Sequence, residues 1–345
     1  MTTEDSTATP PVGETAVRPT RSLRSRLPDE TGVLVALIVL IVVIGVLRPV
    51  FLQPKSLFQL LSNASFTGML ALGMVFVVVI RDIDLSVGWI FNLSAIVAAQ
   101  FMVWGWDPLI SAAIGIAVGG LLGFINGGLA VGLRIPVIII TLGTAYAYRG
   151  LSLVVTGSHS LAPGDKTSPF FGVWTNKLFD VLPSNAVAFV ILAILMHVLL
   201  HHTRFGYRAQ AMGSNPDAAR LAGIPVDRTR IMVMTLMGLI AGLVGVIFVG
   251  FRQAIDPTLG DNYVLPVVAA VIIGGTPLSG GRGTMFGAVI GAVIIQAIQN
   301  GVLFLGVDAK WSFFVTGVVI ILAVAVDQLV RRQRSRRARD VVDAG

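Results

Sequence analysis

The sequence has no cysteine and few acidic residues. Its 345 residues include no cysteine, and only 12% of them are charged. Without cysteine the chain has no disulfide framework, no thiol chemistry and no cysteine-based metal site. Glutamate occurs only at Glu4, Glu14 and Glu30, so every later acidic residue is an aspartate. Soluble domains carry about 25% charged residues, and the composition therefore excludes an ordinary soluble globular protein.

Motifs for catalysis and nucleotide binding are also missing. The sequence contains neither Gly-x-Ser-x-Gly nor His-Glu-x-x-His. A P-loop needs Gly-Lys followed by Ser or Thr, and the two Lys-Ser/Thr steps, at Lys55 and Lys166, follow Pro54 and Asp165 instead. We therefore predict no catalytic residue, no metal site and no cofactor in this chain. If the protein moves a solute uphill, a separate subunit has to bind the ATP that supplies the energy.

Long apolar runs fill most of the chain. Hydrophobic residues make up 55% of it, and the mean hydropathy is +0.85. A helix needs about 20 apolar residues to cross a bilayer. The runs predict an all-α, polytopic membrane protein with about ten transmembrane helices, of which the eighth is short for a full crossing. The predicted spans are 31–51, 57–80, 87–105, 109–133, 136–156, 184–200, 229–251, 262–275, 284–305 and 311–330.

Arginine is unevenly distributed, and its distribution predicts the orientation in the membrane. It is concentrated in 18–26 and 331–339, and ten spans place both termini on one side. Because basic loops face the cytoplasm, we expect both termini there, together with the loop 201–230, which has five arginines where 157–183 has only two lysines. The predicted organisation is a disordered cytoplasmic tail (1–30), a transmembrane domain (31–330) that includes this loop, and a basic cytoplasmic tail (331–345).

The long cytoplasmic loop contains the signals of a short capped helix. Asn215, or Ser214, is suited to cap the first N–H groups, and Pro216 suits the first helical position. Asp217 lies at the positive end of the helix dipole, and Gly223 ends the helix. About two turns of helix are not stable alone in water. We therefore predict that this helix docks on a soluble partner, with an ordinary connecting loop as the alternative.

Glycine and asparagine stand out within the predicted spans. Two series of glycines at four-residue spacing predict close helix packing; they are Gly115, Gly119, Gly123 and Gly127, and Gly283, Gly287 and Gly291. Polar groups at membrane depth are costly, so Asn126 and Asn300 either line a pathway or form hydrogen bonds between helices. By polarity and depth, the candidate pathway residues are Asn63, Asn92, Asn126, Thr141 and Asn300.

Asp82 and Asp84 follow the second predicted span. They could form a proton relay or a cation site, or belong to a structural turn in which Arg81 pairs with Asp82 and Asp84 caps the next helix. No other carboxylate lies well inside a span, which disfavours a proton- or sodium-driven carrier. A second, re-entrant turn is predicted in the Gly-rich segment 274–283. The structural turn residues are Asp82, Asp84, Ser86, Gly88, Gly274, Gly275 and Gly281.

The two turns also carry a faint internal repeat. Residues 79–99 align without gaps on 272–292, so that Leu-Ser-x-Gly at 85–88 falls on Leu-Ser-x-Gly at 278–281. Paired breaks in corresponding halves of a chain are typical of a transport pathway. A membrane scaffold without transport activity is a further alternative, and the asparagines within the spans weigh against it.

Taken in order, the motifs between residues 57 and 327 resemble one family, the membrane-spanning permease of bacterial ABC importers for simple sugars of the ribose, xylose, rhamnose and galactose type. The matching motifs are Ile83-Asp84-Leu85-Ser86-Val87-Gly88, Asn126-Gly127, Arg134-Ile135-Pro136, Thr141-Leu142-Gly143-Thr144, Tyr148-Arg149-Gly150, Thr203-Arg204-Phe205-Gly206, Gly213-Ser214-Asn215, Ala218-Ala219-Arg220-Leu221-Ala222-Gly223-Ile224, Gly274-Gly275-Thr276 through Gly283, and Asn300-Gly301.

The resemblance implies a type II-like ABC importer permease in the bacterial plasma membrane, which forms the translocation pathway for a pentose, hexose or deoxysugar. The implied partners are two cytoplasmic P-loop ATPase subunits, an extracellular or periplasmic sugar-binding protein, a second permease copy in a homo- or heterodimer, and membrane lipid; nucleic acid is not among them. The helix of the cytoplasmic loop would be the coupling helix that docks on the ATPase, formed by Asn215, Pro216, Asp217, Ala218, Ala219, Arg220, Leu221, Gly223 and Ile224.

Arg81-Asp82 departs from the family pattern, because many members have Gly-Gly at this position. An arginine here is more similar to the rhamnose and autoinducer branch, so the resemblance leaves the sugar open. The alternative function is a secondary carrier or channel that acts without an ATPase and draws on a proton gradient.

Overall fold

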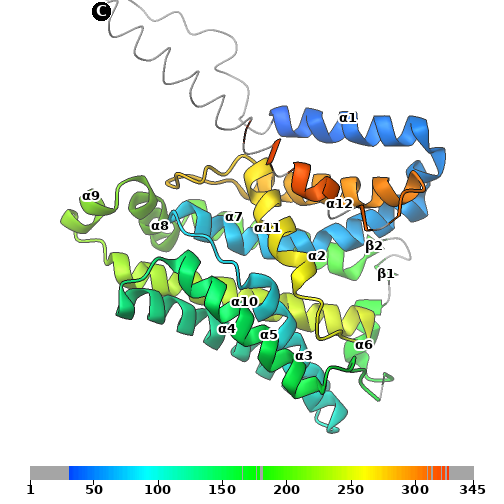
Figure 1. Cartoon of the computed structure of the whole chain (residues 1–345), viewed down its shortest axis with the longest axis horizontal. Helices are drawn as coiled ribbons and strands as arrows, with labels where there is room; N and C mark the ends of the chain where they lie inside the picture. The colour runs from blue at the N-terminus through cyan, green and yellow to red at the C-terminus, as the bar shows by residue number, and fades with distance from the viewer. Residues whose placement is uncertain are drawn as a thin grey trace, which may run out of the picture.

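The computed structural model describes residues 31–325 except 165, 176, 179–181, 309, 312–313, 320 and 323–324. This part is almost entirely helical (Figure 1). The elements are α1 (Thr31–Leu47), the 3-10 helix η2 (Pro49–Leu52), α2 (Pro54–Val79), α3 (Val87–Val103), α4 (Pro108–Leu133), α5 (Val137–Thr156), α6 (Pro169–Thr175), β1 (Lys177–Leu178), β2 (Leu182–Pro183), α7 (Ser184–His201), α8 (Arg204–Ser214), α9 (Pro216–Leu221), α10 (Val226–Arg252), α11 (Asp261–Ile273) and α12 (Met285–Phe304).

The helices confirm the all-α, polytopic prediction. Among the described residues, six helices are long and apolar enough to cross a membrane, namely α2, α4, α5, α7, α10 and α12. Three shorter apolar helices, α1, α3 and α11, coincide with the remaining predicted spans up to residue 275. Half of the last predicted span, 311–330, and both predicted tails, 1–30 and 331–345, lie outside the described residues.

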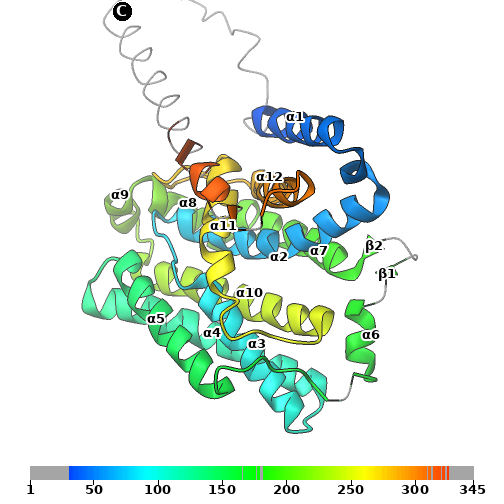
Figure 2. The ribbon, with the colours of Figure 1, turned by 45° about the vertical axis from the view of Figure 1, so that its right-hand side comes forward.

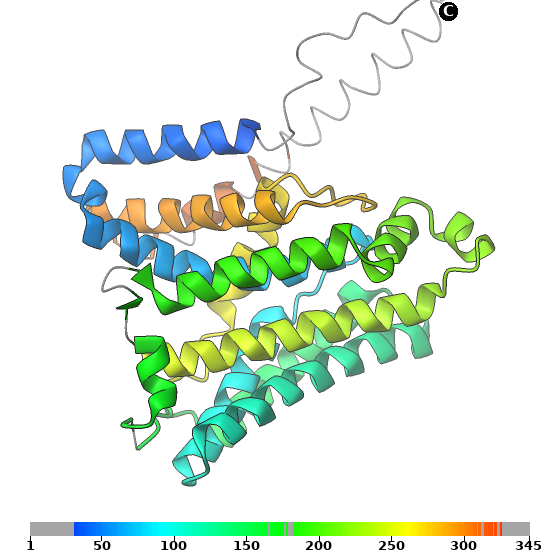
Figure 3. The ribbon, with the colours of Figure 1, turned by 180° about the vertical axis from the view of Figure 1, so that it is seen from behind.

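The long helices lie side by side in two groups (Figures 1 and 2). One group contains α3, α4, α5 and α10, and the other contains α1, α2, α7 and α12. Between them, α11 contacts α2 and α12 on one side and α3 on the other. The helices α8 and α9 lie at one end of the molecule, and α6 with the β1–β2 pair lies at the opposite end (Figure 3).

Glycines bring α4 and α10 into backbone contact. A Cβ atom on Gly123 would collide with the carbonyl oxygen of Met234, and one on Gly119 would collide with the carbonyl oxygen of Gly238. Gly238 meets Gly119 in the same way from the opposite side. Small residues allow membrane helices to pack closely where the hydrophobic effect provides no drive. The predicted packing role of the first glycine series is confirmed.

The second glycine series packs α12 on α11. Cβ atoms on Gly287 and Gly291 would collide with the carbonyl oxygens of Gly274 and Ala270. Gly283 lies before α12 begins and instead faces the side chains of the α2 C-terminus. The packing role is therefore confirmed for the two glycines inside α12, where the backbone of α11 lies against them.

The internal repeat corresponds to two helix–turn–helix units, α2–α3 and α11–α12. The ungapped alignment would pair Val87, where α3 begins, with Gly280, whereas α12 begins only at Met285. The second turn is therefore the longer one. The two turns touch, because the Gly281 N–H donates a hydrogen bond of 2.8 Å to the Val79 carbonyl. Both turns lie at the end of the molecule that carries α8 (Figures 1 and 3).

Candidate functional site

The helix α9 has caps at both ends. The Asn215 side-chain oxygen accepts hydrogen bonds of 3.1 Å from the N–H groups of Asp217 and Ala218. At the other end, the Gly223 N–H donates to the Arg220 carbonyl, and the Ile224 N–H donates to the Ala219 carbonyl, both at 3.0 Å. Gly223 has a φ of +79°. This is the Schellman arrangement, which favours glycine at the left-handed position.

One face of α9 packs on the protein and the other is exposed. Ala219 is 5% exposed, whereas Leu221 is 92% exposed. Arg220 lies 3.9 Å from Asp227, and both side chains are more than half exposed, so this ion pair contributes little to stability. Leu221 and Arg220 are therefore exposed, and the helix that carries them lies at the end of the molecule opposite α6 (Figure 3). Docking on a partner remains a prediction.

The α2–α3 turn (residues 80–86) holds the segments on both sides of α9. The Arg81 guanidinium donates hydrogen bonds to the carbonyl oxygens of Gly213 and Ser214, at the C-terminus of α8. Asp82 forms an ion pair of 2.8 Å with Arg230 near the start of α10. The predicted pairing of Arg81 with Asp82 is therefore wrong. The last carbonyls of a helix have no partner within it and form its negative end. At the C-terminus of α8 these carbonyls are therefore acceptors that compete with Asp82 for Arg81.

A cleft opens beside this turn. It has a volume of about 520 Å³ and lies between the α2–α3 turn, the α4–α5 turn and the beginning of α10. Charged groups of both signs line it, together with apolar residues in and beside the α4–α5 turn. The lining residues are Asp82, Ala130, Val131, Arg134, Ile135, Pro136, Val137, Arg220, Asp227 and Arg230.

Beyond the cleft, Asp84 belongs to a buried hydrogen-bond network. One oxygen of its carboxylate accepts from the Ser86 N–H at 2.8 Å and from the Ser86 hydroxyl at 2.6 Å. The Asn126 amide donates to the Ser86 hydroxyl oxygen at 2.8 Å, and the Tyr148 hydroxyl donates to the Asn126 oxygen at 3.0 Å. Asp84 does not cap α3 as expected, because its bonds go to Ser86, which precedes the helix. The network links the turn to α4 and α5.

Two of the predicted pathway residues are buried in or beside this network. Asn126 is fully buried, and its side chain bonds between helices, which is the alternative role that the sequence left open. Thr141 is also fully buried, and its hydroxyl oxygen accepts from the Leu85 N–H at 3.1 Å. The network therefore ties residues 83–86 to both neighbouring helices, and the described contacts place neither residue in a cavity.

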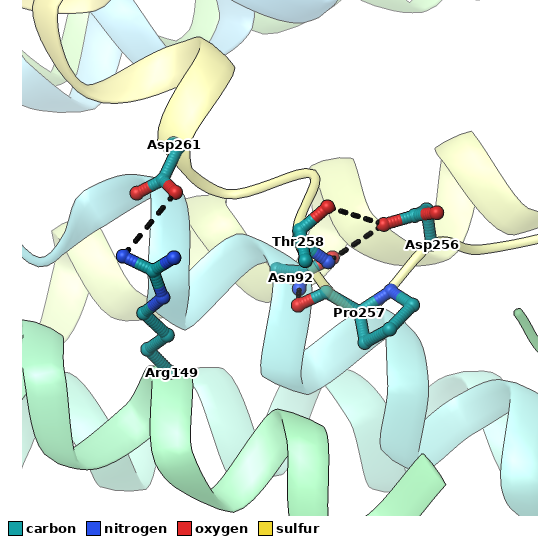
Figure 4. Close-up of polar contacts among 6 residues, drawn as sticks. All are labelled: Asn92, Arg149, Asp256, Pro257, Thr258 and Asp261. Carbon is teal, nitrogen blue, oxygen red and sulfur yellow. Dashed lines mark hydrogen bonds and ion pairs between the residues drawn. The ribbon is translucent and has the colours of Figure 1, made fainter. Parts of the chain in front are cut away.

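Asn92, a third pathway candidate, is buried under the α10–α11 connection (Figure 4). Its amide donates to the Pro257 carbonyl at 2.8 Å. The adjacent Asp256 carboxylate accepts from the Thr258 N–H at 2.7 Å and from its hydroxyl at 2.6 Å, and these bonds lower the pKa of Asp256 below its usual value. This connection is thus a compact turn seated on α3.

Asn63 and Asn300, the other two candidates, line one cavity between α2, α11 and α12. Its volume is about 440 Å³. The Gln296 amide donates to the Asn300 oxygen at 2.9 Å. Seven of the residues that line the cavity have amide or hydroxyl side chains that are not aromatic: Asn63, Thr67, Asn262, Gln296, Gln299, Asn300 and Thr316. Asn63 also lines two neighbouring hollows, of about 430 and 520 Å³.

Among the described residues, one acidic side chain lines the cavity, and an arginine compensates its charge. Asp261 lies 3.5 Å from Arg149 of α5 (Figure 4). The Arg149 guanidinium in turn stacks over the Trp89 ring, 5.3 Å from its centroid. The electrostatic fields of the two opposite charges in such a pair largely cancel beyond the pair. The cavity therefore offers hydrogen-bond donors and acceptors without a strong net charge.

Sequence reasoning did not single out Gln296, Gln299 or Asn262. A signal was present for the first two, because amides three and four residues apart share one face of an apolar helix with Asn300. Of the predicted turn glycines, Gly274, Gly275 and Gly281 lie between α11 and α12, and the last two have φ of +88° and +82°. Gly88 was also predicted in a turn, but it lies inside α3. Within the described residues, no group of three or more His, Asp or Glu side chains is placed to hold a metal ion.

The helical bundle, its polar interior cavity and its charged end define a polytopic membrane protein of the transporter class. Residues 56–324 match the model of the family described as branched-chain amino acid transport system / permease component. The chain belongs to this family of ABC transporter permeases.

Three relatives show where the similarity lies. The ribose import permease protein RbsC of Bacillus subtilis (strain 168) is 38% identical over 300 residues, which cover 87% of this chain and 93% of the relative. The corresponding protein of Escherichia coli (strain K12) is 36% identical, with 86% and 93% covered. The D-allose transport system permease protein AlsC of the same strain is 34% identical, with 88% and 93% covered. The similarity thus extends over nearly the whole length of these sugar permeases.

Proposed function

We propose that this chain is the membrane permease of an ATP-driven importer for a simple sugar. The observation that carries the proposal is the match, over nearly their full length, to permeases named for ribose and allose import. The cavity agrees with this substrate class. Its amide and hydroxyl side chains can exchange hydrogen bonds with the hydroxyl groups of a neutral sugar, and the carboxylate that lines it, Asp261, is already paired with Arg149.

The proposed partners follow from the two ends of the molecule. A cytoplasmic P-loop ATPase, which binds the ATP, docks on α9, where Leu221 and Arg220 are exposed. A sugar-binding protein docks at the opposite end, which carries α6 and the β1–β2 pair, and a second permease copy completes the pathway. The protein lies in the bacterial plasma membrane with its termini in the cytoplasm. The arginines of the α8–α9 segment support this orientation.

The test is a mild-detergent pull-down of the tagged protein from its own cells, with identification of the chains that co-purify. A P-loop ATPase in stoichiometric amount supports the proposal, and a co-purifying binding protein can then be tested with ribose as the first probe. Isolation of the protein alone, even after crosslinking, would contradict the proposal and favour a carrier that works without an ATPase.

A pair of variants tests the docking site. Arg220→Glu should abolish recovery of the ATPase, because it reverses a charge on the exposed face of α9. Lys310→Glu makes the same change in charge at a different place, beyond the end of α12, where the Lys310 side chain is 92% exposed. This variant should leave recovery of the ATPase unchanged. Both variants should insert into the membrane in normal amounts, and equal recovery of the ATPase by both would exclude the proposed docking site.

A further inference from the structure

We propose that Arg81 and Asp82 are positioning residues that join the coupling helix α9 to the interior of the permease. The inference rests on the proposed function, because it concerns how movement of the ATPase reaches the pathway. Two neighbouring side chains hold the two segments that flank α9. The same turn continues into the buried network around Asp84. Arg81 and Asp82 thus connect the surface on which an ATPase docks with the helices α4 and α5.

Arg81 holds the segment before α9. Its guanidinium donates to the carbonyl oxygens of Gly213 and Ser214, and the next residue, Asn215, is the N-cap of α9. The turn approaches closely here, because a Cβ on Gly213 would collide with the Val79 carbonyl. A charged donor that binds the free carbonyls of a helix end forms a strong and directional contact. The start of α9 therefore cannot move far without the α2–α3 turn.

Asp82 holds the segment after α9. Its carboxylate lies 2.8 Å from the Arg230 guanidinium, and the two side chains are only 13% and 29% exposed. The neighbouring pair between Arg220 and Asp227 is longer, at 3.9 Å, and much more exposed. Partly buried, hydrogen-bonded ion pairs resist separation, whereas exposed pairs are worth little. The Asp82 contact therefore restrains the chain as it leaves α9 and enters α10.

The rest of the turn carries the connection inward. The Leu85 N–H donates to the Thr141 hydroxyl oxygen of α5 at 3.1 Å. Ser86 accepts from Asn126 of α4 at 2.8 Å, and the Tyr148 hydroxyl of α5 closes the network. The side chains of Ser86, Asn126, Thr141 and Tyr148 are buried, so breaking their bonds leaves unpaired polar atoms. Residues 81–86 thus act as one rigid link, and a displacement of α9 is passed to α4 and α5.

The first test follows the position of α9 in the purified chain, without any partner. Because the sequence has no cysteine, spin labels can be placed only where wanted, at Ala218→Cys on α9 and at Gly132→Cys on α4, where a side chain meets open space. The distance between the labels is measured by pulsed electron paramagnetic resonance. The wild-type pairings should give a narrow distance distribution.

Loss of either contact should broaden this distribution. The single variants are Arg81→Gln, Asp82→Arg and Arg230→Asp. The double variant, Asp82→Arg with Arg230→Asp, should restore the narrow distribution, because the ion pair re-forms with its charges exchanged. Asp227→Asn is the matched control, since it removes the exposed pair and should change nothing. A narrow distribution in all single variants would overturn the proposal, as would a double variant as broad as its parents. Arg81→Gln keeps the test decisive if a charge reversal prevents folding.

The second test uses the complete importer. Arg81→Gln and Asp82→Asn should lower ribose uptake at least about fivefold, the lower limit of typical coupling between sites, while the ATPase co-purifies in the wild-type ratio. Wild-type uptake rates in both variants would overturn the proposed link alone. If the wild-type protein itself recovers no ATPase, the proposed function fails, and the label distances still decide whether Arg81 and Asp82 position α9.

Discussion

Asparagine side chains in this protein occupy two different surroundings, and their replacement should have two different effects. Asn126 exchanges hydrogen bonds with Ser86 and Tyr148 and is fully buried. Asn300 lines the cavity and bonds to Gln296 on its own helix. At the residue scale, the contribution of an asparagine to stability and its contribution to transport can therefore be measured separately.

We predict that Asn126→Leu destabilises the protein by about 1–3 kcal/mol, because it leaves buried partners unpaired. Asn300→Leu should reduce uptake, because it removes a polar group from the cavity. It should lower the melting temperature less than Asn126→Leu does, because it removes one hydrogen bond, from Gln296 of the same helix. Thermal unfolding in detergent and uptake of ribose in cells measure the two effects. If Asn300→Leu keeps full uptake, the cavity is not the pathway.

Gly223 is the residue on which the end of α9 depends. Its φ of +79° is unfavourable for other L-residues by about 1–2 kcal/mol. Gly223→Ala should therefore open α9, and trypsin cleavage at Arg220 and Arg228 should become roughly 5–30-fold faster, since cleavage follows the population of the open form. Gly128→Ala, which meets open space inside a helix, is the control. Equal cleavage of both variants would show that the cap does not order the helix.

At the scale of elements, the α4–α10 contact is where added volume is least tolerated. We predict that Gly123→Ala destabilises the protein by about 1–3 kcal/mol, as overpacking does, because its Cβ would collide with the Met234 carbonyl. Gly128→Ala on the same helix should be neutral or stabilise it by about 0.5–1 kcal/mol, because alanine is the better helix former. Thermal unfolding of the two variants makes the comparison, and equal melting temperatures would contradict the packing.

Local elements could be predicted from the sequence because their causes are local. The caps of α9 depend on Asn215 and Gly223, which lie within a few residues of the bonds that they make. The glycine series of α4 was visible at four-residue spacing for the same reason. The cavity could be predicted only in part. Asn63 and Asn300 were found by their polarity, but the shape of the cavity that joins them depends on the packing of three helices.

Contacts between distant segments could not be predicted in this way. Arg81 was expected to pair with its neighbour, but its acceptors lie more than a hundred residues further along the chain, at Gly213 and Ser214. Asp82 likewise pairs with Arg230. Nothing in a single sequence identifies these partners. For Asp82, several arginines of the loop 201–230 were equally plausible. The tertiary fold alone decides between them.

At the scale of the whole molecule, the orientation in the membrane can be tested with single cysteines. We predict that His159→Cys, near the end that carries α6, reacts with a membrane-impermeant maleimide in spheroplasts. Leu221→Cys on α9, where the native side chain is 92% exposed, should react only after permeabilisation, because the proposed topology places that end in the cytoplasm. The cysteine-free parent is the blank. The reverse pattern would invert the proposed topology.

The glycine contact between α4 and α10 also bears on how the protein is made. During synthesis, α4 leaves the ribosome about 90 residues before α10, a delay of roughly 5–20 s at usual translation rates. Throughout that interval the glycines that meet α10, Gly119 and Gly123 among them, lack that partner. The first half of the bundle therefore waits in the membrane as an incomplete intermediate, and a nascent chain arrested before α10 is the form that membrane quality control should recognise and degrade.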